Sequence, residues 1–352
     1  NVIPNEAFAA TLYAGNGAAT GSITDDIKSF GPDFVWLKQR NGTNYHTIFD
    51  STRGATKAVY PNDPEAEATN ADTLQAFESD GFELGTSGGV NGNNNTFVAW
   101  NWKANGGTTS TLTGGTIDSV VQANTDAGFS IVTYTGDDQA RATVAHGLSK
   151  APEMIIVKNR DEAITGPAWA VYHAFNTSAP ATDYLDLSTT GDTDDAETLW
   201  SDEVPTDTLV ILGTADSVNS GSAHVMYCFH SVEGYSRLGS YVGNGVTSGD
   251  GTFIYLGFRP AWLMIKNSTA AGEWLLLDNA RNPFNEVDII LNADADTKEA
   301  DFETTNRNID FLSNGFKIKS NAAGGTTATN TTNATYIYMA FAEAPFKYAN
   351  AR

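Results

Sequence analysis

Pro32-Asp-Phe-Val-Trp-Leu-Lys38 recurs in the same chain as Pro152-Glu-Met-Ile-Ile-Val-Lys158 and as Pro260-Ala-Trp-Leu-Met-Ile-Lys266. Each stretch opens with a proline, continues as an apolar run and closes with a lysine six residues after the proline. Short runs of β-branched and aromatic residues are typical of strands, and proline is tolerated as the first residue of a strand. We therefore expect three equivalent strands, which indicates an internal repeat.

Two further anchors extend the repeat on either side of these strands. An aromatic-x-Gly-polar turn precedes each proline, with 18 or 19 residues from the aromatic residue to the proline, and a short aromatic-rich run closes each unit. The turns are Tyr13-Ala-Gly15-Asn16, Tyr134-Thr-Gly136-Asp137 and Tyr241-Val-Gly243-Asn244, and the closing runs are Phe97-Val-Ala-Trp100, Met226-Tyr-Cys-Phe229 and Tyr338-Met-Ala-Phe341. The chain therefore contains three complete units.

The segments between these anchors also have the pattern of strands. Repeats one and three match at Thr47-Ile-Phe-Asp50 and Leu275-Leu-Leu-Asp278, and again at 80–85 and 314–318, whereas repeat two has looser counterparts at 169–173 and 208–213. Repeats one and two also share a Val-Asn pair, which ends at Asn91 and at Asn219. Repeat two is thus the most divergent copy.

These short runs predict an all-β protein of three tandem antiparallel β-sandwich domains, of the jelly-roll or lectin-like kind. The predicted boundaries are 1–104 for repeat one, 127–232 for repeat two and 233–352 for repeat three. Residues 105–126 are rich in Gly and Thr and are predicted to be a linker, in which 117–121 could add a strand or an arm. Short helices are expected only at 64–74 and 298–302, where Ala and acidic residues cluster.

The composition excludes several kinds of partner. The 352 residues include 20 Lys and Arg against 42 Asp and Glu, so the net charge of −22 argues against nucleic acid as a partner. One cysteine cannot form an intrachain disulfide. Because the chain has neither a signal sequence nor an apolar run of about eighteen residues, we expect no membrane insertion. Asn1 in place of Met indicates a trimmed or processed chain, or part of a longer one.

Residues that recur once per repeat are best explained by the architecture, because few enzymes need one active residue in three successive cores. Lys38, Lys158 and Lys266 each end a strand, where a lysine normally lays its stem on apolar surface and keeps its ammonium group in water. Asp50-Ser-Thr-Arg53 and Asp278-Asn-Ala-Arg281 are interpreted as turns held by a charge-assisted hydrogen bond rather than as catalytic pairs.

The other reactive side chains point to no catalytic, cofactor or metal site. Cys228 aligns with Ala99 and Ala340, so it is expected to pack as a small apolar residue. The acidic loops 192–195 and 294–299 match a calcium loop poorly, and solvated loops are the favoured interpretation. No metal-binding spacing relates the histidines, which are His46, His146, His173, His224 and His230.

Sequence motifs of common enzymes are also missing. The chain has neither a phosphate-binding Gly-rich loop followed by Lys nor a Gly-x-Ser-x-Gly motif. A glycosidase could still place two distant carboxylates face to face on folding, since their separation is set in space. We nevertheless predict a protein that is not an enzyme and that needs no cofactor.

The residues quoted above resemble a known family. The stretches that carry the resemblance are 124–136, 152–159, Phe97-Val-Ala-Trp-Asn-Trp-Lys103 and Gly257-Phe-Arg-Pro-Ala-Trp-Leu-Met-Ile-Lys266. They are similar to a repeated domain of unknown function in structural proteins of tailed phages, especially marine ones. Its members are usually described as virion or tail-fibre-like proteins and occasionally as lectin-like. The resemblance covers nearly the whole chain and brings no catalytic residues.

This resemblance implies a non-enzymatic structural protein of the extracellular virion, placed in the tail or in a tail fibre that contacts the host surface. A capsid decoration protein and a carbohydrate-binding, lectin-like module are the alternatives. The implied partners are other virion proteins, a host-surface glycan and further copies of the chain, with a trimer as one form. Alternatively, the three repeats of one chain could themselves form a pseudo-threefold body.

A glycan site, if the protein has one, is predicted in the loops after the two Val-Asn pairs. Asn91 and Asn219 supply amides there, and Trp100 and Trp102 are candidates for stacking on a sugar ring. Trp100 aligns with phenylalanines in the other repeats, which favours a core position, and Trp102 lies on the same strand face.

Overall fold

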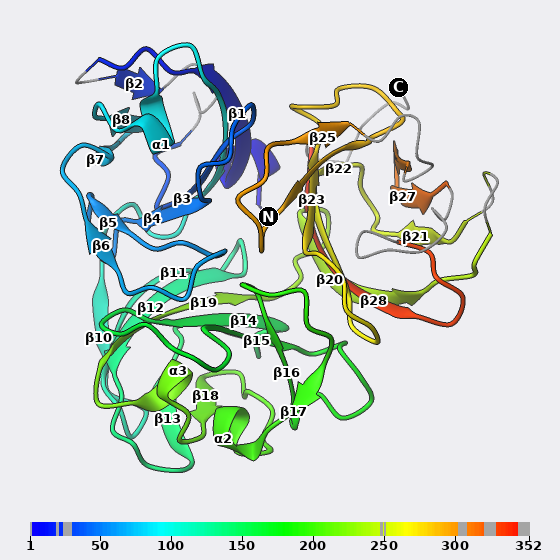
Figure 1. The fold of residues 1–352 in the computed structure, drawn as a ribbon. Coiled ribbons are helices and arrows are strands. Elements are labelled where there is room, and N and C mark those ends of the chain that lie inside the picture. The colour runs from blue at the N-terminus through cyan, green and yellow to red at the C-terminus, as the bar shows by residue number, and fades with distance from the viewer. Residues whose placement is uncertain are drawn as a thin grey trace.

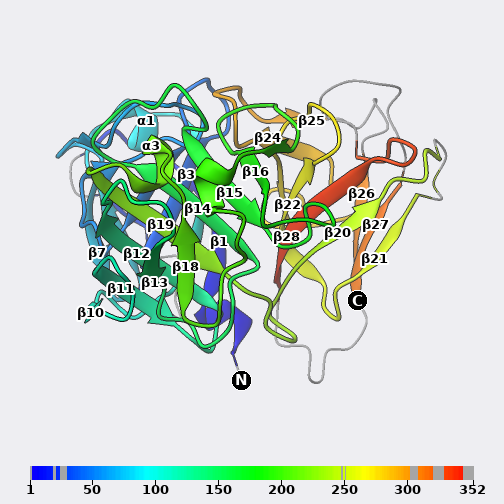
Figure 2. The same cartoon turned by 90° about the horizontal axis from the view of Figure 1, so that it is seen from below.

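The chain folds as an assembly of antiparallel β-sheets, as seen in the computed structural model, which describes residues 2–18, 21–23, 30–246, 249, 251–301, 308–319 and 329–343. The predicted all-β class is confirmed, since helices within these residues are short. Figure 1 shows three bodies around a common centre, with repeat one from blue to cyan, repeat two in green, and repeat three from yellow-green to red. Seen from below, repeat two lies in front of repeat one and beside repeat three (Figure 2).

Each repeat contributes one large sheet. The strand orders are β1-β9-β3-β4, then β10-β11-β12-β19-β14-β15-β16-β17, and β20-β28-β22-β23-β24-β25. The strands of these sheets are β1 Phe8–Ala14, β3 Phe34–Gln39, β4 Thr47–Asp50, β9 Thr96–Trp102, β10 Ser110–Leu112, β11 Ser119–Asn124, β12 Phe129–Thr135, β14 Met154–Asn159, β15 Trp169–His173, β16 Asp183–Asp186, β17 Asp194–Asp195, β19 Ala223–Phe229, β20 Ser236–Val242, β22 Pro260–Asn267, β23 Leu275–Asp278, β24 Ile289–Asn292, β25 Ala300–Asp301 and β28 Thr335–Ala342.

Smaller elements cover the outer side of each large sheet or connect its strands. The small sheets have the orders β2-β8-β7, β13-β18 and β21-β27-β26, and β5 pairs with β6. Their strands are β2 Gly21–Ile23, β5 Lys57–Ala58, β6 Ala68–Thr69, β7 Leu74–Glu78, β8 Gly81–Leu84, β13 Ala142–Ala145, β18 Leu209–Leu212, β21 Phe253–Tyr255, β26 Ile309–Leu312 and β27 Gly315–Ile318. The helices are η1 Pro4–Glu6, α1 Gly88–Asn91, α2 Glu197–Trp200 and α3 Asp216–Asn219.

The proline-led runs become the equivalent strands β3, β14 and β22, as predicted. Each lies between the closing strand of its repeat and the next strand in sequence, so the three large sheets share one pattern of neighbours. The register gives the correspondence between repeats, because the third residue after each proline, Val35, Ile155 or Leu263, faces Asn101, Cys228 or Ala340 respectively. Cys228 is buried as predicted, but by this register it corresponds to Asn101 and Ala340, so the predicted match with Ala99 is wrong by two residues.

Two predictions about the connecting segments are wrong. Residues 105–126 are not a plain linker, since β10 and β11 extend the sheet of repeat two, and 117–121 does add a strand. The segment 64–74 forms no helix and contains β6, while 298–302 contains β25, with Phe302 outside the described residues. Glu67 and Glu299 in these segments instead pair with arginines of neighbouring repeats.

Both faces of each large sheet are buried, which explains the unbroken apolar runs. Alternate residues of a strand point to opposite faces. In β3, Val35 and Leu37 join a cluster that belongs to repeat one, whereas Phe34 and Trp36 point into a core shared by all three repeats. The same division holds for β14 and β22, whose outward residues join separate clusters of repeats two and three.

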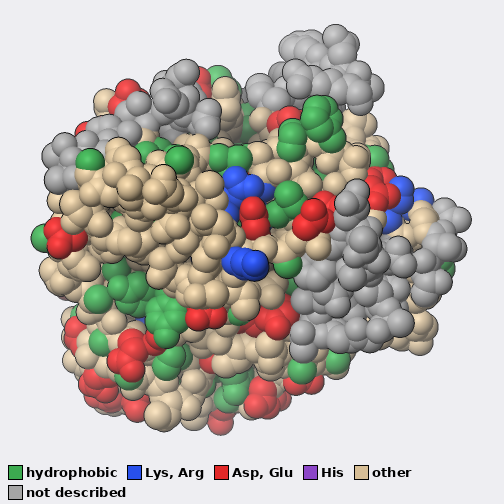
Figure 3. Space-filling model, turned by 45° about the horizontal axis from the view of Figure 1, so that its top comes forward, with side chains coloured by type: hydrophobic (Ala, Val, Ile, Leu, Met, Phe, Trp, Pro, Cys, Tyr) green, Lys and Arg blue, Asp and Glu red, His purple; other side chains and the backbone are tan. Residues whose placement is uncertain are grey.

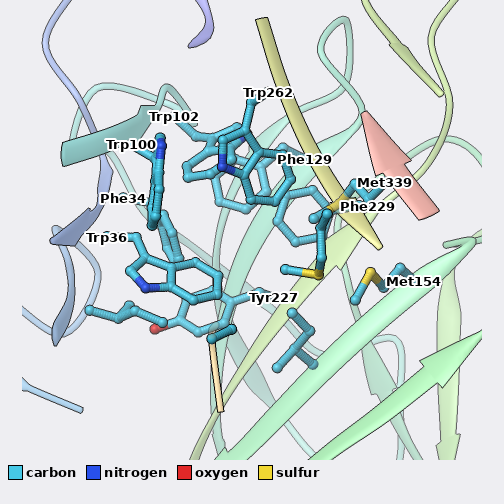
Figure 4. Packing of buried hydrophobic residues seen from close by; sticks show 14 of the residues in the cluster. Phe34, Trp36, Trp100, Trp102, Phe129, Met154, Tyr227, Phe229, Trp262 and Met339 are labelled. Atoms are coloured by element: carbon cyan, nitrogen blue, oxygen red, sulfur yellow. The ribbon is translucent and has the colours of Figure 1, made fainter. Parts of the chain in front are cut away.

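The shared core, hereafter the central core, is rich in aromatic side chains from all three repeats (Figure 4). Rings of repeats one and two meet at Phe34 and Tyr227, whose centroids are 4.8 Å apart. Trp102 of repeat one and Trp262 of repeat three lie 5.4 Å apart. Every tryptophan except Trp200 belongs to this core. Among the described residues, this core encloses a void of about 10 Å³, which has room for about one water molecule.

The central core predicts that the three repeats unfold together. Trp262→Ala removes a fully buried ring from it and should cost about 3–5 kcal/mol of unfolding free energy. Hydrogen exchange during urea unfolding should show amides of all three repeats losing protection in one transition, moved to lower urea. Phe284→Ala, at a side chain that is 81% exposed, is the control that should leave the transition in place. Separate transitions, with only repeat three weakened, would contradict the shared core.

Candidate functional site

The predicted glycan-binding asparagines lie inside the protein. Asn91 and Asn219 are 2% and 0% exposed. The amide group of Asn91 donates to the carbonyl oxygens of Ala18 and Gly85, and its Oδ1 accepts from the Asn16 backbone. Asn219 makes the matching bonds with the backbones of Gln139, Gly213 and Asp137. Their placement therefore does not support the predicted glycan site, because these amides already satisfy the backbone.

These asparagines explain the Tyr-x-Gly-polar anchor. In each repeat the tyrosine hydroxyl donates to the residue before the asparagine, at 2.7–2.8 Å: Tyr13 to Val90, Tyr134 to Val218 and Tyr241 to Thr329. A Cβ on Gly15, Gly136 or Gly243 would come within 2.2 Å of a backbone oxygen just after the asparagine, so only glycine fits. Asn330 is the third asparagine, which the Val-Asn comparison missed because Thr329 replaces the valine.

The two candidate stacking residues are also buried. Trp100 and Trp102 are 0% and 1% exposed, and both belong to the central core. Trp100 donates from Nε1 to the Asp278 carboxylate of repeat three, at 3.0 Å. Neither ring is available for stacking on a sugar. The predicted core position of Trp100 is confirmed, but by sheet register the phenylalanines of the other repeats correspond to Trp102.

The strand-ending lysines are not exposed, which corrects the prediction that their ammonium groups reach water. Lys38, Lys158 and Lys266 are each 0% exposed. Each Nζ donates to a backbone carbonyl of a neighbouring repeat: Lys38 to Asp296 at 3.1 Å, Lys158 to Pro64 at 2.9 Å and Lys266 to Thr190 at 3.1 Å. Burial lowers the pKa of each lysine to about 8, and nearby carboxylates oppose that shift.

The direction of these contacts is cyclic. Repeat one reaches into repeat three, repeat two into repeat one, and repeat three into repeat two. The backbone two residues after each lysine follows the same order, since the carbonyls of Arg40, Arg160 and Ser268 accept from the amides of Glu299, Glu67 and Thr193 at 2.8–3.1 Å. The three repeats thus close a ring through three equivalent joints.

Charged side chains reinforce two of the three joints. Arg40 binds both carboxylate oxygens of Glu299, and Arg160 binds both oxygens of Glu67. Burial alone would raise the pKa of Glu67, but its hydrogen bonds and charge contacts with Arg160 and Arg53 lower it. The third joint has Ser268 in place of an arginine. A Lys-x-Arg pattern in repeats one and two was the available sequence signal for these pairs.

The two Asp-x-x-Arg turns are held by charge-assisted hydrogen bonds, as predicted, and these ion pairs are buried. The Nε atoms of Arg53 and Arg281 donate to Asp50 and Asp278 at 2.5 and 2.6 Å, and these side chains are 0% exposed. Burial alone would lower the pKa of Arg53, but the charges of Asp50, Tyr227 and Glu67 and the hydrogen bond to Asp50 together outweigh burial and raise that pKa. Each carboxylate also accepts from the central core, Asp50 from Tyr227 at 2.8 Å and Asp278 from Trp100.

Repeat two has a neutral group at the position that Asp50 and Asp278 occupy in the other repeats. His173 stands where the other repeats have aspartate, and the residue of repeat three that corresponds to Tyr227 and Trp100 is Met339, which cannot donate. Burial lowers the pKa of His173 to about 4. Its Nδ1 accepts from the Phe175 amide, and its Nε2 lies 3.3 Å from the Tyr338 carbonyl. A neutral histidine therefore replaces the Asp–Arg pair where the neighbouring repeat offers no donor.

The cross-repeat bond from Tyr227 to Asp50 gives a direct test of the ring. Tyr227→Phe removes one donor from a buried carboxylate and should lower the unfolding free energy by about 1.5–3 kcal/mol. Urea unfolding measures the change. Tyr255→Phe removes a hydroxyl from a side chain that is 59% exposed and is the control. Equal, near-zero effects of the two substitutions would show that the contact contributes nothing to stability.

The acidic loops do not form a metal site in the described part of the chain, where no three His, Cys, Asp or Glu side chains are placed to hold an ion. Asp294 is instead half-buried beside Glu273, and its Oδ1 accepts from the Trp274 amide. Burial, together with the charge of Glu273, raises the pKa of Asp294 to about 7. The fold therefore favours the protonated form of this carboxyl group more than the unfolded chain does.

Asp294 should make stability depend on pH. Because its pKa is higher in the folded than in the unfolded chain, the contribution of Asp294 to stability falls as pH rises between about pH 4 and pH 7. The buried histidines, whose pKa values are lowered, contribute with the opposite sign in this range. Within this window, the Asp294 contribution changes the unfolding free energy by up to about 1.4 kcal/mol per pH unit. In urea unfolding at pH 5 and pH 8, Asp294→Asn should remove the Asp294 contribution, so that the change in stability from pH 5 to pH 8 becomes more positive than in the parent. Asp195→Asn, at an exposed acid, is the control and should keep the parental slope.

One open groove lies outside these joints. It has a volume of about 480 Å³ and is formed by repeat one. Its walls include Thr43, Asn44, Tyr45, Tyr60, Asp63 and Glu65, with further side chains from 70–73 and 87–90. The sequence prediction pointed to the loop beside Asn91, and Val90 does line this groove, but the tyrosines were missed. Comparing the repeats would have found them, since neither tyrosine has an aromatic counterpart in the other two.

The molecular surface is acidic, in line with the net charge. Figure 3 shows Asp and Glu side chains spread over one face, with Lys and Arg confined to a few places. Within the described residues, no helix has the length and apolar character needed to cross a bilayer.

Comparison with known proteins identifies the family and nothing beyond it. A family model described as "Domain of unknown function (DUF7483)" matches residues 3–345. The chain belongs to this family. No curated protein and no solved structure matches the chain.

Proposed function

We propose that this member of the DUF7483 family is a non-enzymatic structural protein of a tailed-phage virion, placed in the tail or a tail fibre that contacts the host surface. The observation that carries the proposal is the use of the recurring ionisable groups. The lysines and the Asp–Arg pairs are buried in the contacts that hold the repeats together. Such groups serve shape and stability, which is what an exposed particle component needs.

The architecture supports a robust building block. Each large sheet and its small partner sheet enclose a separate cluster, an arrangement that fits the expected β-sandwich of jelly-roll or lectin-like kind. The ring closes within one chain, so the pseudo-threefold body expected as the alternative to a homotrimer needs no second copy. Further copies and other virion proteins would then attach to its outside.

Immunogold electron microscopy of the phage that encodes this chain tests the proposal. Antibodies raised against the recombinant protein should label the tail or its fibres. Label over the capsid would replace the tail assignment by the decoration role. Particles without label at tail or capsid, checked against a positive control antibody to a major capsid protein, would overturn the proposal.

A further inference from the structure

The groove of repeat one is not a consequence of the repeated architecture. Tyr45 precedes β4 in repeat one, whereas the corresponding loops of repeats two and three, 161–168 and 269–273, contain no aromatic residue. Tyr60 corresponds by sheet register to Asp186 and Asn292. The shared residues are explained by their role in the repeated fold. The two tyrosines occur in only one of the three repeats, so that role does not explain them.

The chemistry of the groove matches a saccharide. Tyr45 is 45% exposed, and its ring meets that of Tyr60 at 6.0 Å with a 63° angle between their planes. Tyrosine in such a position offers a flat apolar face beside polar groups, as a sugar ring requires. Hydroxyl, amide and carboxylate side chains line the remaining wall, including Thr43, Asn44 and Asp63. They can accept from or donate to sugar hydroxyl groups.

The charge of the groove selects among saccharides. Asp63 and Glu65 line it, and both raise the pKa of Tyr45, Asp63 by a hydrogen bond as well as by its charge. Asp296 of repeat three adds a further negative charge. A sialylated, uronic or phosphorylated sugar would be repelled by this field, whereas the hydroxyl groups of a neutral sugar can donate to the carboxylates.

The ring of repeats holds the groove in shape. Repeat two supports the wall at 60–65, because Trp169 donates from Nε1 to the carbonyls of Tyr60 and Asp63, and Lys158 donates to that of Pro64. The Glu65 amide donates to the Asp63 carboxylate at 2.9 Å and orients it. A site fixed before binding loses less conformational freedom when the ligand arrives.

We propose that this groove binds a neutral oligosaccharide, with the exposed face of Tyr45 stacked on a sugar ring and Asp63 and Glu65 accepting from its hydroxyl groups. This inference deepens the proposed function in that a host-surface glycan is the source of the ligand, but the site is defined by its own residues. If the groove binds no glycan, the proposed virion location is unaffected. If the protein is not found in the virion, the proposed binding site is unaffected.

An array of neutral hexose and N-acetylhexosamine oligosaccharides, printed beside sialylated and uronic ones, tests the site on the full chain. We expect binding to neutral members only, with affinity then measured by calorimetry on the best one. Tyr45→Ala should weaken that affinity at least tenfold. Tyr255→Ala, at an exposed tyrosine of repeat three, is the matched control and should leave the affinity unchanged. Both variants change exposed side chains, and circular dichroism verifies that they fold.

Three results would overturn the inference. They are silence of the array toward all neutral glycans, preference for acidic glycans, and equal binding by the Tyr45→Ala and control variants. A Lys-rich peptide that binds the groove while glycans do not would assign it to protein recognition instead. Release of reducing sugar from the bound oligosaccharide would replace the binding role by hydrolysis through Asp63 and Glu65.

Discussion

The structure depends on one constraint: each large sheet is apolar on both faces. One face is covered by the small sheet of its own repeat, and the other would lie in water if the repeats stood apart. Packing three such faces together buries the tryptophans and phenylalanines of the central core, and burial of aromatic rings is among the largest contributions to stability that a side chain can make. The repeats are thus bound to one another by the same strands that define them.

Polar contacts then determine how the three faces meet. An apolar core alone is tolerant of small rotations and slips. The lysines and Asp–Arg turns at its rim need particular carbonyl and hydroxyl partners from the adjacent repeat, and a buried charge without them is costly. The two sides of one joint differ together, since repeat two has His173 in place of aspartate and repeat three has Met339 in place of the donors Tyr227 and Trp100. The polar rim therefore specifies the order and orientation of the repeats.

Much of the fold was accessible from the sequence, whereas its assembly was not. Strand positions followed from the proline-led runs, and the burial of Cys228 followed from its alignment with Ala340, whereas its alignment with Ala99 was wrong by two residues. The lysines were misplaced because a strand end normally meets solvent, and nothing local to Lys38 reveals that a loop near Asp296 lies over it. The unbroken apolar runs were the neglected signal, since an antiparallel sheet with one wet face shows alternation. Asn91 and Asn219 were wrongly assigned to a glycan site. Their recurrence in two repeats was a sign of a structural role rather than of ligand binding.

Covalent continuity of the three repeats has a consequence for stoichiometry. A ring assembled from separate identical subunits dissociates on dilution and displays every surface feature three times. Here the neighbours are tethered, so closure is intramolecular and independent of protein concentration. The copies are also free to diverge, and each chain presents a single groove lined by Tyr45. If the groove binds a ligand as proposed, one chain offers a single site, and multivalent binding then requires several chains rather than the symmetry within one.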